Sequence, residues 1–144
     1  MSLVDKNRVD PRLGGYGTAP AATSLSDPTL WPRVQDYKRL LSARMTAIGR
    51  DEMRARLPAG ELHVSRKLDG EFTVLVLAGD EAFTVNPGGT VRVGLPCVAE
   101  AQALAAKAGI TQALIAGELY LARPGTRTRV HDATNALGRP RDKA

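Results

Sequence analysis

The feature that most constrains the fold is a change to a two-residue repeat after Gly60. From there to Leu95, apolar and polar side chains alternate, and turn-forming residues interrupt the alternation three times. Alternation of this kind is typical of β-strands, and glycine beside aspartate or asparagine between two such runs favours a tight turn. The pattern therefore predicts an antiparallel β-meander, whose strands span the segments 62–67, 72–77, 81–85 and 90–95.

Helical patterns flank this meander on both sides. Upstream, a capped helix start at residues 26–28 precedes apolar residues that recur at steps of three and four as far as Ile48. Downstream, a proline opens a helix over residues 97–108, and a long strand follows over residues 110–122. A short helix capped by Asp132 comes next. The fold class is predicted to be α+β, an antiparallel β-meander with flanking helices.

The first part of the chain follows neither repeat. Residues 1–28 are rich in glycine, proline, alanine, serine and threonine, a composition typical of loops. We expect residues 1–28 to be a flexible lead-in and residues 29–144 to form one domain, because 144 residues suit a single hydrophobic core.

Composition also restricts where such a chain could work. The sequence has one cysteine, Cys97, so no internal disulfide can form. It has no run of 18 apolar residues and no signal-peptide core at its start. We therefore expect a cytoplasmic protein that has no membrane partner, with a monomer favoured.

The charge distribution is uneven. The net charge is +5: segments 1–58 and 121–144 each carry +4, from ten basic against six acidic and six basic against two acidic residues, and segment 59–120 carries −3, from four against seven. Basic flanks around an acidic centre suit a polyanion lying across a metal-assisted site. On charge alone, a solvated arginine-rich surface explains the distribution better.

Three short motifs occur in order along the meander and the strand after it. They are Lys67-Leu68-Asp69-Gly70, the turn Asn86-Pro87-Gly88-Gly89-Thr90, and Ala116-Gly117-Glu118-Leu119-Tyr120. Together they resemble the signature of covalent nucleotidyltransferases, and above all of bacterial ATP-dependent DNA ligases. The likeness runs from about Leu62 to Tyr120. Phe72 and Pro87 depart from it, since the family commonly has basic residues at those places.

The resemblance implies a fold, a reaction and a site. The fold would be part of a ligase adenylation domain, without the later motifs and the C-terminal OB-fold of such enzymes. Lys67 would attack ATP, with Mg²⁺ present, and carry AMP as a phosphoramidate; the AMP would pass to a 5′-phosphate of nicked DNA, and a 3′-hydroxyl would then seal the nick. Glu118 would hold a ribose hydroxyl or the metal. The implied nucleotide-binding residues are Ser65, Arg66, Lys67, Asp69, Gly70, Arg92 and Glu118.

Other interpretations fit the same residues. RNA ligation or another covalent nucleotidyl transfer uses the same lysine motif. A nucleic-acid-binding module could keep the fold and lack turnover. Taken alone, Lys67 also fits an exposed lysine that protects a sheet edge from aggregation. The acids Asp69 and Glu71 favour the ammonium form of a nearby lysine, whereas attack requires the neutral amine. A lysine nucleophile therefore requires that these carboxylates be compensated or point away.

Overall fold

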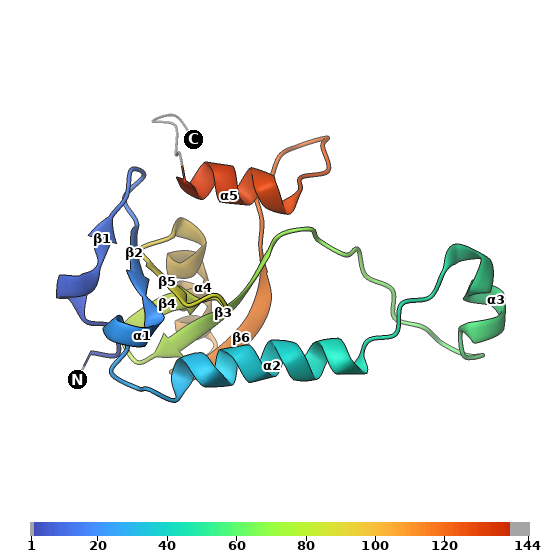
Figure 1. Cartoon of the computed structure of the whole chain (residues 1–144), viewed down its shortest axis with the longest axis horizontal. Helices are drawn as coiled ribbons and strands as arrows, with labels where there is room; N and C mark the ends of the chain where they lie inside the picture. Colours follow the sequence, from blue (N-terminus) through green and yellow to red (C-terminus); the bar gives the residue numbers. More distant parts are fainter. Residues whose placement is uncertain (1, 139–144) are drawn as a thin grey trace.

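The structure is a computed structural model and describes residues 2–138. An antiparallel sheet forms its centre, and helices pack on both faces (Figure 1). The elements, with η marking 3-10 helices, are η1 Lys6–Arg8, β1 Asp10–Pro11, β2 Gly17–Pro20, α1 Ala21–Ser24, α2 Leu30–Arg44, η2 Arg50–Glu52, α3 Met53–Arg56, β3 Glu71–Ala78, β4 Glu81–Val85, β5 Thr90–Val93, α4 Pro96–Lys107, β6 Gln112–Leu119 and α5 Val130–Gly138.

The six strands are ordered β1-β2-β5-β4-β3-β6, and every neighbouring pair is antiparallel. Strands β3, β4 and β5 form the predicted meander, because short turns join them. After α4 crosses the sheet, β6 pairs with β3 along its whole length, from Glu71 opposite Leu119 to Ala78 opposite Gln112. The α+β class and the antiparallel sheet with flanking helices are therefore confirmed.

One face of the sheet carries the main hydrophobic core. Valines and Phe83 project from β3, β4 and β5 against α1 and the first half of α2, where Leu30 and Val34 are buried. The N-terminus of α2 is fixed to the β4–β5 turn, since Trp31 Nε1 donates to the Pro87 carbonyl at 3.1 Å. Further along α2, Tyr37 stacks on Phe72 of β3, with ring centroids 6.4 Å apart.

The opposite face is smaller and more polar. Tyr16, Leu95 and Val98 form a second apolar cluster there, and Leu137 of α5 packs against it. The Tyr16 hydroxyl donates to the Leu137 carbonyl and so ties α5 to the segment before β2. In Figure 1, α5 and α2 lie on opposite sides of the strands.

Residues 1–28 are not the loop that their composition predicts. In the described part, β2 pairs with β5 over four residues, and Val4, Ala19 and Ala21 are buried in the main core. The reason is tertiary: β5 has an open edge on the side away from β4, and a short strand of small residues completes it, although its local sequence carries little strand preference.

Two further expectations about regular structure are wrong. Residues 62–67 form no strand, although their side chains alternate, because they pair with no neighbouring strand and Val64 is 90% exposed. The first helix ends at Arg44, so Met45 and Ile48 fall outside it. The second half of α2 and α3 extend away from the sheet (Figure 1), and Met45 is accordingly exposed.

Candidate functional site

The lysine motif lies in an irregular segment that leads directly into β3. Lys67 is exposed, and its amine donates a long 3.5 Å hydrogen bond to the Leu68 carbonyl. Three residues on, Gly70 lies against β6: a Cβ at this position would be 2.5 Å from the Leu119 carbonyl oxygen. The φ of Gly70 is not positive, so the Asp69-Gly70 sequence does not form the tight turn that its residues favour; the close approach of β6 is what requires the glycine.

A cavity of about 500 Å³ lies beside Lys67. The motif segment forms one wall, and the chain that follows β6 forms the other. The lining residues are Arg66, Lys67, Leu68, Asp69, Tyr120, Leu121, Ala122, Arg123, Pro124, Thr126, Arg127 and Thr128. Among these described lining residues four are basic and Asp69 is the one acid. Their charge makes the cavity cationic and suits an anionic ligand such as a phosphate group.

Asp69 is paired with an arginine from the start of α5. Arg129 Nη1 lies 3.1 Å from its carboxylate. The position of Arg129 is fixed in turn by Asp132, whose carboxylate accepts the Arg129 backbone N–H at 2.7 Å and lies 3.7 Å from Arg123 Nη1. Asp132 lies in the first turn of α5, and its carboxylate caps the residue just before the helix. The same carboxylate joins the two ends of the loop 123–129.

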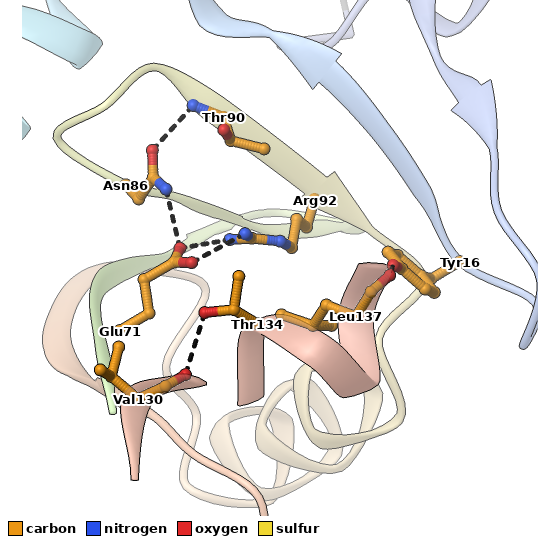
Figure 2. A network of polar contacts seen from close by, with 8 residues as sticks. All are labelled: Tyr16, Glu71, Asn86, Thr90, Arg92, Val130, Thr134 and Leu137. Carbon is orange, nitrogen blue, oxygen red and sulfur yellow. Dashed lines mark hydrogen bonds and ion pairs between the residues drawn. The ribbon is translucent and has the colours of Figure 1, made fainter. Parts of the chain in front are cut away.

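Arg92 belongs to a buried network on the α5 face of the sheet (Figure 2). Both of its terminal nitrogens bind the Glu71 carboxylate, at 2.6 and 2.9 Å. Asn86 also donates to Glu71, at 2.7 Å, and accepts the Thr90 backbone N–H. Arg92 is predicted to bind a nucleotide; in the structure its guanidinium is paired with Glu71, and its side chain is 9% exposed.

Glu118 does not join Lys67 at the cavity. It lies opposite Phe72 in the β3–β6 pairing, on the face that carries α2, and it is exposed. It is not among the residues, within the described range, that line the cavity. Of the other predicted site residues, Arg66 and Asp69 line it, and Ser65 is exposed just before it.

The predicted site residues do not include Arg123 and Arg127, which line the cavity, or Arg129, which pairs with Asp69. Nothing in their local sequence shows that the loop after β6 folds back on the lysine motif. The Glu71–Arg92 pair did leave a signal, because an arginine in the middle of the buried strand β5 requires an anionic partner. Two buried hydroxyls on the same face, Thr73 and Thr84, have no hydrogen-bond partner among residues 2–138.

The site has no preformed metal centre in the part of the chain that is described: no three His, Cys, Asp or Glu side chains between residues 2 and 138 lie close enough to share an ion. Within the same range, no helix has the length and apolar character needed to cross a membrane. No family model matches the chain, and comparisons with curated proteins and with solved structures find no match either.

Proposed function

We propose that this chain carries the nucleotide-attachment step of a covalent nucleotidyltransferase similar to ATP-dependent DNA ligases, with Lys67 as the nucleophile. The observation that carries the proposal is the position of the Lys67 amine on a cationic cavity of about 500 Å³. This volume lies within the usual range for small-molecule sites. Arg66 and Arg127 supply positive charge for the phosphates of ATP.

The proposed reaction is a displacement at phosphorus. The neutral Lys67 amine attacks the α-phosphorus of ATP and forms a nitrogen–phosphorus bond. The bond from that phosphorus to the bridging oxygen breaks, pyrophosphate leaves with the electron pair, and the amine loses its proton to solvent. In the complete reaction, AMP passes to a 5′-phosphate on nicked DNA, and a 3′-hydroxyl displaces AMP to seal the strand.

Mg²⁺ does not fit this site as a resident ion. The carboxylates of Asp69 and Glu71 are each paired with an arginine, and Glu118 lies elsewhere on the sheet. In the proposal, Mg²⁺ therefore arrives with the triphosphate of the substrate, and no step depends on a protein-held metal.

A label-transfer assay tests the proposal. The chain is incubated with ATP labelled at the α-phosphate and with Mg²⁺, denatured, and examined for protein-bound label. We expect label in the wild type and none in Lys67→Ala. Lys107→Ala is the matched control, because Lys107 is an exposed lysine at the end of α4, and this variant should be labelled normally. Label that persists in Lys67→Ala rules out the assignment, and labelled GTP in place of ATP tests the other nucleotidyl transfers.

A second candidate is nucleic-acid binding without turnover. The separation of Glu118 from the cavity favours it, because the resemblance requires that carboxylate at the nucleotide. Binding of fluorescent nicked DNA that falls steeply with salt, weakens in Arg66→Gln/Arg127→Gln, and is accompanied by no protein label would establish this alternative. The same titration with an RNA duplex tests the ribonucleotide version.

A further inference from the structure

Two acidic residues follow Lys67 closely, and each is paired with an arginine from a distant part of the chain. Glu71 is held by Arg92 of β5, and Asp69 is held by Arg129 at the start of α5. This arrangement bears on the reactivity of Lys67, because an uncompensated carboxylate near a lysine stabilises the ammonium form, which has no electron pair for attack.

The two pairs differ in kind. The Glu71–Arg92 pair is buried between β3 and β5, and it is needed there to satisfy the buried guanidinium. The Asp69–Arg129 pair is more open, with side chains 30% and 52% exposed, and ion pairs of that sort contribute little to stability. We therefore expect the Asp69–Arg129 pair to act on the electrostatic potential near Lys67 and on the orientation of the Asp69 carboxylate.

Asp69 is the carboxylate that matters most for Lys67. The charged or titratable groups that face Lys67 across the cavity or from its own segment are Arg66, Asp69, Tyr120, Arg123 and Arg127. Among these described residues Asp69 alone can carry a negative charge near neutral pH. Arg129 compensates this one acid, and the other charged groups at the cavity are arginines.

Arg129 is held in place from both sides of the loop. Asp132 accepts its backbone N–H and also pairs with Arg123, and α5 is tied to the body of the protein through the Tyr16 hydroxyl and the Leu137 carbonyl. The Arg129 guanidinium therefore binds Asp69 from a backbone position that hydrogen bonds hold in place.

We propose that Arg129 is a positioning residue of the Lys67 site: it binds the Asp69 carboxylate and compensates its charge, so that the Lys67 amine is more reactive than it would be beside a free carboxylate. The catalytic meaning of this inference rests on the proposed function, in which Lys67 is the nucleophile. The electrostatic link itself does not require ATP.

The test measures the chemical reactivity of Lys67 without any enzymatic step. The whole chain is acetylated with trace acetic anhydride over a range of pH, and mass spectrometry of the Lys67 peptide gives the rate of modification at each pH. The variants are Arg129→Gln, Arg129→Lys, Asp69→Asn and the double variant Asp69→Asn/Arg129→Gln. Arg39→Gln is the matched control, because Arg39 forms an exposed pair with Asp36 on α2.

We expect Arg129→Gln to slow the acetylation of Lys67 roughly threefold at a fixed pH near neutrality. Arg129→Lys should restore most of the wild-type rate, and Arg39→Gln should leave it unchanged. Asp69→Asn should raise the rate. In the Asp69→Asn background, Arg129→Gln should have little further effect, because Arg129 acts through the carboxylate.

Two results overturn the inference: an Arg129→Gln profile that coincides with the wild type, or an equal shift with and without Asp69, which would mean a direct charge effect. Melting curves followed by circular dichroism establish that each variant is folded. Asp69→Asn tests the same interaction by removing the carboxylate in place of the arginine. Failure of the proposed function is separate, since it would appear as absent AMP label while the acetylation profiles still responded to Arg129.

Discussion

Removing one partner of the buried Glu71–Arg92 pair should strongly destabilise the fold. The Glu71 carboxylate accepts three hydrogen bonds, two from Arg92 and one from Asn86, at 2.6 to 2.9 Å. Glu71→Leu leaves the guanidinium with no anion in a place where its side chain is 9% exposed. Such a loss typically costs 3–5 kcal/mol, and because Glu71 is 20% exposed, we expect about 3 kcal/mol.

A double variant distinguishes the cost of leaving one charge unpaired from the cost of replacing the whole ion pair. Arg92→Met alone leaves a carboxylate without its main partner and should also destabilise the protein. Glu71→Leu/Arg92→Met removes both charges and replaces them with apolar side chains, so it should cost much less than the sum of the two single changes.

Urea unfolding followed by circular dichroism measures these free energies for all four proteins. A protein of this size typically has 5–15 kcal/mol of stability, so each variant should remain folded without urea. Two results would contradict this role of the ion pair: a loss of less than about 1 kcal/mol in either single variant, or single losses that add in the double variant.

Three further changes test other parts of the structure. Gly70→Ala would put a Cβ 2.5 Å from the Leu119 carbonyl oxygen, so urea unfolding should show a loss of about 1–3 kcal/mol; unchanged stability would mean that β6 approaches less closely. Phe83→Ala empties a position that is 1% exposed and should cost about 3–5 kcal/mol in the same assay, and a loss below 1 kcal/mol would place this ring outside the core. The Thr29 hydroxyl and then its backbone N–H donate to Asp27 and hold the pKa of that carboxyl below its ordinary value. The contribution of the ionised Asp27 carboxylate to stability should be complete above about pH 4 and be lost as the pH falls through the lowered pKa. An NMR titration of Asp27 measures this pKa, and an ordinary value would contradict the prediction.

Much of the central sheet could be predicted because its signals are local. The strand at residues 81–85 was placed with its observed bounds, since a glycine–aspartate turn and an asparagine–proline–glycine turn enclose it. The helix opened by Pro96 was placed within one residue for the same reason: a proline and a glycine mark its two ends. In both segments the local preference and the tertiary structure agree.

The remaining errors have a common physical cause, which is dependence on partners far along the chain. The alternation at residues 62–67 predicts a strand, but no neighbouring strand pairs with it. The segment Gly17–Pro20 has almost no strand preference, yet the open edge of β5 makes it one. Arg92 was expected at a ligand, and the structure pairs it with Glu71 instead.

The candidate site shows the same division. The motif from Lys67 to Gly70 could be recognised from its residues, and the structure places it on a cavity. The opposite wall, formed by the chain after β6, depends on how the loop 123–129 folds back and has no local signature. Glu118 was predicted to share the cavity because its motif follows in order, but motif order does not determine on which face of β6 a side chain projects.

The most direct test of the central claim is the location of any covalent nucleotide on the protein. After reaction with ATP and Mg²⁺, the wild-type chain is digested, and the modified peptide is sequenced by mass spectrometry under alkaline conditions. We expect AMP on the side-chain nitrogen of Lys67 and on no other residue. AMP on a different side chain, or an unmodified chain after prolonged incubation, would contradict it.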